Sequence, residues 1–399
     1  MLSIRKNALA ACLCSLLLQG AARADTAAGD AALKQGDYPT ALREYRAAAR
    51  ANDPAAEAGL GIMYLNGRGV EADLPAAIKW FRQAADQGNA TAQFSLGLMY
   101  AAGTGVPQSD VEAANWQKRA AEQGNADAQH ELGGFYFEGK GVERNPAEAF
   151  KWFKRAADQG NREGQDSLAG MYAMGVGVQQ DYQEAIRLYR LAADQGEPRA
   201  QFNLGLLNEH GQGMPRDYAE ALRLLRLSAA QNYTGAQVEI GSLYSNGRGV
   251  EKNDAEAVKW FRTAAMRGDA MAENDLASSY DHAWGVTQDY REAVNWYRLS
   301  VTQHTPIAEE NLGTVYANGH GVERNYVVAW ALWSVATRGY SDARRHDNLQ
   351  ILHGERLKLA DLMSQDDMNE GDALAQQMLD AGDPLVPMDA WLARAAMKK

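Results

Sequence analysis

The sequence predicts an all-α fold: a right-handed α-solenoid of about eight 36-residue helix-turn-helix repeats with helical caps. Three observations support this prediction: an unbroken 36-residue period, a glycine turn within each period, and a helix N-cap residue shortly after each turn. Such a period is typical of solenoids, in which each unit buries its apolar face against its neighbours.

Each period opens with the pattern of a buried helix. The pattern begins at the column Leu60, Leu96, Leu132, Leu168, Leu204, Ile240, Leu276 and Leu312. A small residue follows each time, at Gly61, Gly97, Gly133, Ala169, Gly205, Gly241, Ala277 and Gly313, and three residues later comes a tyrosine, replaced only at Asn208. Positions i, i+1 and i+4 share one helical face, so we expect a second helix to approach closely at the glycine.

The second helix of each period has its own start signal. After a Gly-x-Gly-Val turn, as at residues 67–70, comes the N-cap column Asp73, Ser109, Asn145, Asp181, Asp217, Asn253, Asp289 and Asn325. Glutamate three residues later in six repeats predicts capping boxes, at Glu112, Glu148, Glu184, Glu220, Glu256 and Glu292. An alanine column beginning at Ala77 should let this helix lie on the glycine of the first. A tryptophan column beginning at Trp80 should seal the joint between neighbouring repeats.

The pattern resembles the Sel-1-like repeat family, a relative of the tetratricopeptide repeat. The resemblance covers residues 54–340 and is carried by motifs such as Ala92-x3-Leu96-Gly97-x2-Tyr100-x2-Gly103-x-Gly105-Val106 and Ala113-x2-Trp116-x3-Ala120-Ala121-x2-Gly124. It implies a scaffold for protein interactions, because exported members usually scaffold envelope assemblies or engage host proteins. Some cysteine-rich members bind β-lactams.

The rest of the chain divides around the repeats. Residues 1–24 are predicted to be a secretory signal, with Arg5 and Lys6 before an apolar run and Ala22-x-Ala24 at the cleavage site. Lipidation at Cys12 is the alternative, but too little apolar length precedes it. Residues 25–53 should form N-terminal capping helices. Residues 341–380 should form C-terminal capping helices, opened in part by a capping box at Ser364, and residues 381–399 a loose tail.

Composition limits the chemistry. Both cysteines, Cys12 and Cys14, lie in the predicted signal, so the mature chain would have no disulfide and no thiolate metal site. The formal net charge of −11 would fall to −14 with removal of the three basic residues of the signal. That charge disfavours nucleic acid and anionic membrane surfaces. We expect no cofactor, no metal, no membrane insertion after cleavage, and a monomer in the periplasm or outside the cell.

No catalytic set stands out. Gly134-x4-Gly139-Lys140 approaches a phosphate-binding loop, but Gly141 occupies the Ser/Thr position and these glycines recur as turns. His130-Glu131 lacks the second histidine of a zinc helix. The only Ser-x-x-Lys motif, Ser3 to Lys6, falls inside the signal. The sequence therefore predicts no enzyme, with β-lactam binding or hydrolysis as the alternative.

Four variable columns in the first helices give the candidate binding surface. If these helices line the concave face, as in tetratricopeptide solenoids, it holds an apolar strip followed by a polar, acidic part. The predicted partner-binding residues are Phe94, Leu98, His130, Phe137, Met174, Phe202, Leu206, Glu209, His210, Asp281, His282 and Glu310. Phe94 and Phe202 could equally be core between repeats. Such a groove suits a protein or peptide with hydrophobic anchors and a basic end.

The leading prediction is an exported adaptor, and a second is a regulator that sequesters an enzyme or receptor domain. Repeat seven departs most from the pattern: it has Ala277 and Ala283 in place of glycines and Trp284 in its turn. These departures are either drift of the repeat or a second site.

Overall fold

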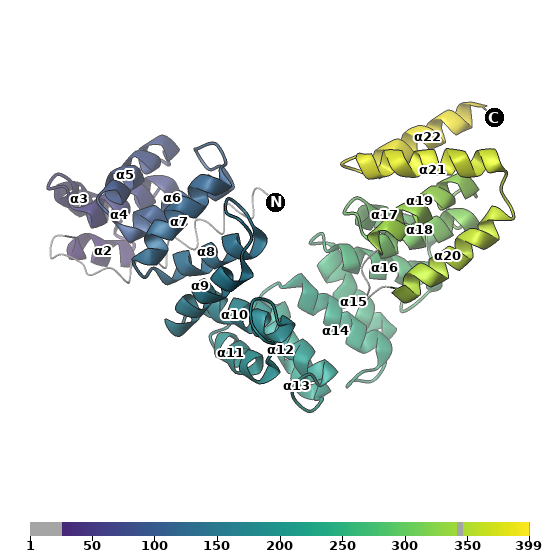
Figure 1. The fold of residues 1–399 in the computed structure, drawn as a ribbon, viewed down its shortest axis with the longest axis horizontal. Helices are drawn as coiled ribbons and strands as arrows, with labels where there is room; N and C mark the ends of the chain where they lie inside the picture. The colour runs from purple at the N-terminus through teal and green to yellow at the C-terminus, as the bar shows by residue number, and fades with distance from the viewer. Residues whose placement is uncertain (1–25, 341–345, 399) are drawn as a thin grey trace. The chain divides into compact units, whose positions relative to one another are not determined.

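The computed structural model describes residues 26–340 and 346–398. Every regular element in those ranges is an α-helix, which confirms the predicted α-solenoid (Figure 1). The chain forms two compact units, residues 1–200 and 201–399, whose boundary falls within helix α12 (Pro198–His210). The predicted signal, with Cys12 and Cys14, lies outside the described residues.

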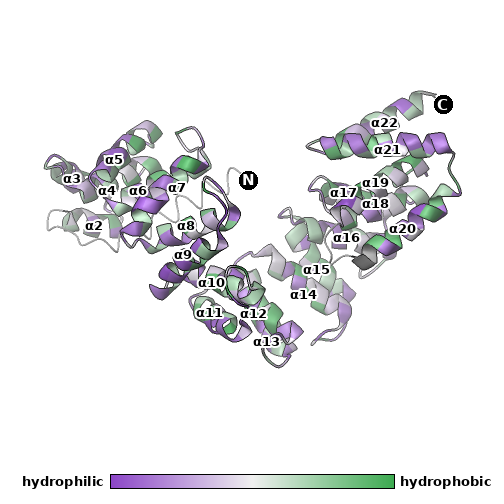
Figure 2. Ribbon diagram, viewed as in Figure 1, coloured by the Kyte–Doolittle hydropathy of each residue, from purple (hydrophilic) through white to green (hydrophobic). Residues whose placement is uncertain are grey.

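Eight helix pairs correspond to the eight periods. The first unit contains α4 (Pro54–Asn66) and α5 (Leu74–Asp86), α6 (Ala90–Ala102) and α7 (Asp110–Glu122), α8 (Ala126–Glu138) and α9 (Pro146–Asp158), and α10 (Arg162–Met174) and α11 (Tyr182–Asp194). The fifth pair is α12 with α13 (Tyr218–Ala230). The second unit also contains α14 (Thr234–Asn246) and α15 (Asp254–Ala265), α16 (Ala270–His282) and α17 (Tyr290–Val301), and α18 (Pro306–Asn318) and α19 (Tyr326–Gly339). Hydrophobic and hydrophilic residues alternate along these helices, as expected when each buries one face (Figure 2).

Further helices lie at both ends of the array. Helices α2 (Ala27–Lys34) and α3 (Tyr38–Ala49) precede repeat one, and α20 (His346–Ala360), α21 (Gln365–Asp380) and α22 (Leu385–Lys398) follow repeat eight. Ser364 and Asp367 form the predicted capping box of α21. The expected loose tail is wrong, because α22 occupies it. Buried Leu385 and Met388 hold α22 in the core, and the Trp391 indole donates to the Glu370 carboxylate at 2.8 Å.

The turn within each repeat closes as the glycines indicate. In repeat one Gly67 is left-handed, with φ of 65°, and its N–H donates to the Met63 carbonyl at the end of the first helix. The Asp73 side chain then accepts from the Ala76 N–H and caps the second helix. The Asp73 N–H donates to the Tyr64 carbonyl at 2.9 Å, and the same bond recurs in every repeat. The predicted N-cap column is confirmed.

The capping boxes predicted for the repeats are only half formed. Each N-cap side chain accepts from the backbone, but its own N–H is already bonded to the first helix and needs no glutamate. Four of the six glutamates pair instead with a cation one turn on, as in Glu148 with Lys151 at 2.6 Å. The Glu292 carboxylate accepts from the Trp296 indole at 2.9 Å. Ser364 forms the complete box with Asp367: the Ser364 N–H donates to the Asp367 carboxylate, and the Asp367 N–H donates to the Ser364 hydroxyl.

In repeats one, three, six and eight the close contact between the two helices is between a ring and a glycine. A Cβ added to Gly61 would lie 2.6 Å from the Phe81 ring, and one added to Gly241 would lie 2.4 Å from that of Phe261. The first and second helices can therefore touch only because the Cβ is absent. The alanine column lies at the same contact: Ala77 is fully buried, and the backbone carbonyls of Ala221 and Ala329 lie 3.4 and 3.3 Å from where a Cβ of Gly205 and Gly313 would stand. The sequence did not foresee that the residue one turn later, Phe81 in repeat one, covers the glycine.

The tryptophan and tyrosine columns join neighbouring repeats. Trp116 of repeat two packs against a core cluster that contains Ile62 and Phe81 of repeat one, which supports the predicted role of its column. The Tyr100 hydroxyl accepts from Arg82 of the preceding repeat at 2.9 Å. The same bond, eighteen residues apart, joins Arg46 to Tyr64, Arg226 to Tyr244 and Arg262 to Tyr280.

A buried polar column, not foreseen from the sequence, also crosses the joints. The Gln93 amide donates to the Ala85 carbonyl of the preceding repeat at 3.1 Å and accepts from Gln123 of its own repeat at 2.7 Å. The second bond recurs for Gln129 with Gln159, Gln165 with Gln195, and Gln201 with Gln231. Buried amides of this kind need partners, and here adjacent helices provide them. Glutamate occupies the column at Glu57, Glu273 and Glu309.

We expect Leu132→Ala to lower the free energy of unfolding by about 2 to 5 kcal/mol, because Leu132 is 1% exposed and its cavity would not be refilled. Glu148→Ala should lower it by less than about 1 kcal/mol, because it removes only a surface ion pair. Urea titrations measure both changes. Equal losses would show that the assignment of core and surface columns is wrong.

We expect Glu309→Gln to stabilise the fold at neutral and alkaline pH. Burial raises the pKa of Glu309, which is 2% exposed, from 4.5 to about 7. The unfolded carboxyl therefore ionises from about pH 4.5 while the folded one stays protonated, and the parent loses stability as pH rises to about 7. The gain of the variant should be about 1 to 3 kcal/mol above pH 7 and should vanish below about pH 4.5.

The matched control is Glu57→Gln in the same column, where Gln83 and Gln87 already donate to the carboxylate. Denaturant titrations from pH 4 to 8 should show a smaller gain for this variant. A gain for Glu309→Gln that does not depend on pH would rule out ionisation as its cause.

Candidate functional site

The C-terminal halves of the first helices carry the positions that vary most between repeats. The four columns begin at Ala58, Ile62, Leu65 and Asn66, and burial separates them. Most of the Ala58 column is buried or half-buried, whereas most of the Asn66 column is exposed. Successive first helices contact one another directly, α4 with α6, α8 with α10, and α16 with α18. We refer to the surface formed by the Ile62, Leu65 and Asn66 columns within each unit as the first-helix face.

In the first unit the first-helix face is apolar. Leu98 and Phe137 are half-buried, and the Met174 side chain is 59% exposed on the last turn of α10. Phe94 does not belong to this surface. It is 1% exposed and packs with Ala128 and Leu132 in a core cluster, so its prediction as a binding residue is wrong.

His130 lies in a polar cluster of the first unit. Its Nε2 is 3.2 Å from the Ser167 hydroxyl, which also accepts from the Arg199 guanidinium at 2.9 Å. Arg199 in turn pairs with the buried carboxylate of Asp166. Burial, followed by the Arg199 charge, lowers the pKa of His130 to about 4. The ring is therefore neutral at physiological pH and contributes hydrogen bonding rather than charge.

In the second unit, the face starts with partly covered apolar groups. The centroid of the half-buried Phe202 ring lies 5.2 Å from that of Tyr233, and both residues pack against a core cluster shared by repeats five and six. Leu206 is half-buried one turn further on, and His210 is exposed at the end of α12. Leu206 and His210 therefore present side-chain surface, whereas part of Phe202 fills the joint with repeat six.

Glu209 is not part of an exposed acidic surface. It is 2% exposed, and its Oε1 lies 3.3 Å from the guanidinium of Arg248, which comes from the turn of repeat six. Burial and the neighbouring Glu209 carboxylate raise the pKa of Glu239. A surface role predicted for Glu209 is wrong, because the interlocking of adjacent repeats covers the side chain.

The remaining predicted residues lie in repeats seven and eight. The Asp281 carboxylate lies 3.9 Å from Nδ1 of His282 and 3.7 Å from Nδ1 of His320. His282 is exposed and stacks on the Trp284 indole, with ring centroids 4.6 Å apart. Glu310 is half-buried and accepts from the Tyr340 hydroxyl at 2.7 Å. Asp281 and His282 therefore lie together, and Glu310 belongs to a separate contact with the end of α19.

The structure adds a pocket that the columns did not single out. It has a volume of about 390 Å³, lies between repeats six and seven, and includes Ser242, Ser245 and Ser278 of the first-helix face. Trp284, noted above as a departure from the pattern, forms part of its wall, together with Asp275. Asp275 could have been suspected from its column, which elsewhere holds Gly, Ser, Asn or Glu, but its column alone does not place it in a pocket.

The described residues offer little for metal or membrane chemistry. Across residues 26–340 and 346–398, no group of three or more His, Cys, Asp or Glu is arranged to hold a metal ion. No helix in those ranges is long and apolar enough to cross a membrane.

Comparison with known proteins identifies the repeat. The Sel1 repeat model matches residues 54–89, 90–125, 126–161, 163–197, 198–233, 234–269, 270–303 and 306–339. A Sel1 repeat protein from Oxalobacter formigenes is 34% identical over 61% of this chain and 97% of its own, with a TM-score of 0.57. A protective antigen of uropathogenic Escherichia coli strains, described as having an SLR fold, is 33% identical over 91% of this chain and 83% of its own, with a TM-score of 0.49.

No curated protein matches the chain significantly. The eight matched repeats cover most of the residues from α4 to α19, in agreement with the helix pairs of the structure. The chain belongs to the Sel1 repeat family, whose fold is typical of non-enzymatic scaffolds for protein interactions.

Proposed function

We propose that this chain is an exported adaptor that binds a segment of a partner protein on its first-helix face. The observation that carries the proposal is the contrast between columns. Framework columns repeat and are buried or hydrogen-bonded, whereas Phe137, Met174 and His210 occupy columns that change in every repeat and remain accessible. Accessible positions that the fold leaves free are where a repeat protein can acquire specificity.

Hydrophobic anchors of the partner would lie on the first unit. Leu98, Phe137 and Met174 present apolar surface from three successive repeats. Methionine adapts its shape to an irregular partner, and a partly exposed phenylalanine offers a rigid face. Truncating the central anchors of an interface typically costs about 2 kcal/mol or more of binding free energy.

A basic end of the partner would lie on the second unit. Among the described residues, the Asp281 carboxylate forms ion pairs with His282 and His320, and both exist only when those rings are protonated. The net charge of the chain, −11, would also speed the approach of a basic segment. Glu209 takes no part, because Arg248 already covers it.

Export is the second part of the proposal. The features that support it are Arg5 and Lys6, the apolar run 8–18 and the Ala22-x-Ala24 site. The mature adaptor would act as a monomer in the periplasm or outside the cell, without lipid.

The anchors are tested by Phe137→Ser with Met174→Ser, assayed by capture of the partner from envelope extract. Both side chains are accessible, so folding should persist in circular dichroism while dissociation of the captured partner speeds up at least about tenfold. The control is Leu191→Ser with Leu227→Ser. These leucines are 42% and 44% exposed on second helices and should have no effect on capture. Equal effects of the two pairs would contradict the first-helix face as the binding surface.

The processed N-terminus tests export. We expect N-terminal sequencing and intact-mass measurement of the exported protein to give a chain that starts at Asp25 and carries no lipid. A mature chain that begins at a diacylated Cys12 would instead anchor the protein to a membrane leaflet.

A further inference from the structure

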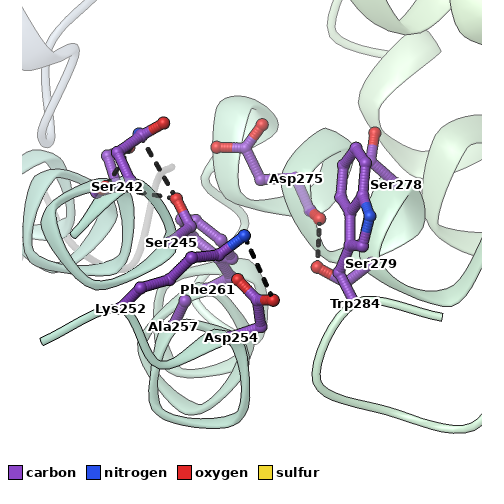
Figure 3. A pocket seen from close by; sticks show the side chains of 11 residues that line it. Ser242, Ser245, Lys252, Asp254, Ala257, Phe261, Asp275, Ser278, Ser279 and Trp284 are labelled. Atoms are coloured by element: carbon purple, nitrogen blue, oxygen red, sulfur yellow. Dashed lines mark hydrogen bonds and ion pairs between the residues drawn. The ribbon is translucent and has the colours of Figure 1, made fainter. Parts of the chain in front are cut away.

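The pocket between repeats six and seven opens on the first-helix face of the second unit. Figure 3 shows Ser242, Ser245, Lys252 and Asp254 on one side, Trp284 on the other, and the carboxylate of Asp275 between them. The Phe261 ring, which lies on Gly241, forms part of the lining. The pocket therefore combines an apolar floor, an indole wall and a carboxylate, and its volume of about 390 Å³ can hold a planar side-chain head group.

Trp284 follows a residue that departs from the repeat pattern. Seven repeats place glycine at the C-cap of the first helix, and repeat seven has Ala283 there, with the left-handed φ of 59°. A residue with a Cβ is strained in this conformation. Trp284 follows directly, is 51% exposed, and has the His282 ring stacked on one face. An exposed indole braced on one face is suited to contact a guest with the rest of its surface.

Asp275 brings a carboxylate with few partners. Among the described residues, its one side-chain hydrogen-bond donor is the Asn274 amide, 3.1 Å away. Burial raises its pKa to about 6, so it is mainly ionised at pH 7 without an ion pair in that part of the chain. A partly buried charge of this kind is stabilised by a cation placed beside it.

The other charges of the pocket do not favour an anion. The Lys252 ammonium lies 3.6 Å from the Asp254 carboxylate, and its side chain is 63% exposed. This pair leaves Asp275 as the uncompensated charge of the lining. Glu239, whose pKa is raised by burial and in smaller part by the charge of Asp275, is a further acid near this carboxylate.

We propose that this pocket binds the guanidinium of an arginine side chain in the partner segment, stacked on Trp284 and hydrogen-bonded to Asp275. The inference rests on the proposed function, because it names the anchor by which a basic segment is recognised. A guanidinium is planar, stacks on aromatic faces and donates two parallel bonds to a carboxylate. The ammonium group of a lysine is not planar, so it cannot stack on the Trp284 indole and form two parallel bonds to Asp275 in this way.

The test uses a blocked tripeptide, acetyl-Gly-Arg-Gly-amide, titrated into the exported chain by calorimetry. The matched citrulline peptide keeps the shape and loses the charge, so it should bind about tenfold or more weakly. The lysine peptide should also bind more weakly than the arginine peptide. Equal binding of arginine and citrulline peptides, or tighter binding of the lysine peptide, would overturn the assignment of a guanidinium.

Two variants locate the binding. Asp275→Asn and Trp284→Thr should each weaken binding of the arginine peptide about tenfold. Threonine already occupies the Trp284 column at Thr104, so the fold accommodates it. The control is Glu131→Gln, in the same column as Asp275 four repeats earlier, which should leave binding unchanged. The titrations are run at about pH 8, because burial raises the pKa of Glu131 to about 7 and that of Asp275 to about 6, so both acids are then ionised. Circular dichroism melts of all three check that they fold.

The outcomes separate this inference from the proposed function. A chain that captures its partner through Phe137 and Met174 but does not bind the arginine peptide would refute the pocket alone. A chain that binds the peptide through Asp275 and Trp284, yet whose partner capture is indifferent to the face variants, would refute the proposed face and leave the pocket. Weakening by Glu131→Gln equal to that by Asp275→Asn would also overturn the pocket, because the effect would then be one of net charge.

Discussion

In four of the eight repeats, the contact between a ring and a glycine determines how closely the two helices approach. A Cβ at Gly133 would lie 2.6 Å from the Phe153 ring, a separation that real side chains do not adopt. In these repeats the ring therefore sets the separation between the first and second helices, and the turn that joins them must span that separation. The caps use the same device: the Tyr45 ring covers Gly59, and the Trp330 ring covers Gly371 of α21.

The other four repeats fill this position differently. In repeats two and five the glycine is kept, and the side chains of Gln117 and Leu225 lie against it. Repeats four and seven have alanine in the glycine column, at Ala169 and Ala277, and in both the ring residue is tyrosine. In both, the tyrosine hydroxyl lies against the next residue of the first helix. The Tyr189 hydroxyl is 3.5 Å from where a Cβ of Gly170 would lie, and the Tyr297 hydroxyl bonds Ser278 at 3.0 Å. Where alanine replaces the glycine, the facing ring is thus a tyrosine whose hydroxyl lies against the next residue of the first helix. Substitutions that look like drift in the sequence are coupled in the structure.

Much of the architecture could be predicted because it follows from local rules that repeat. Asp73 and its column are N-caps because short polar side chains satisfy the free N–H groups of a helix start, and Ser364 with Asp367 does the same for α21. The helix over the last residues was missed because Pro384 and Pro387 suggested a loose segment. Proline is tolerated in the first turn of a helix, and α22 begins at Leu385.

The candidate site was harder to predict because it depends on how neighbouring repeats fit together. Phe94 and Glu209 lie in variable columns, yet Phe94 fills a joint and Glu209 is covered by Arg248 from the next turn. Sequence period assigns a residue to a face of its own helix, but the neighbouring repeat decides whether that face is open. Met174 and His210 were predicted more easily, because each is the last residue of its first helix and its side chain is exposed there.

Repeat seven shows why a framework of this kind can hold a site. Each repeat is fastened to its neighbours by several independent contacts, so one strained position such as Ala283 can persist without loss of the fold. The neighbouring Gly285 keeps its left-handed φ of 67° and its close approach to the backbone of Asp254, so the turn still closes. Strain is thereby confined to the residue that precedes Trp284. Ala283 departs from the glycine rule in an otherwise regular turn, beside an exposed indole and a pocket. Such a departure is expected where a requirement for binding, and not for folding, determines which residue is present.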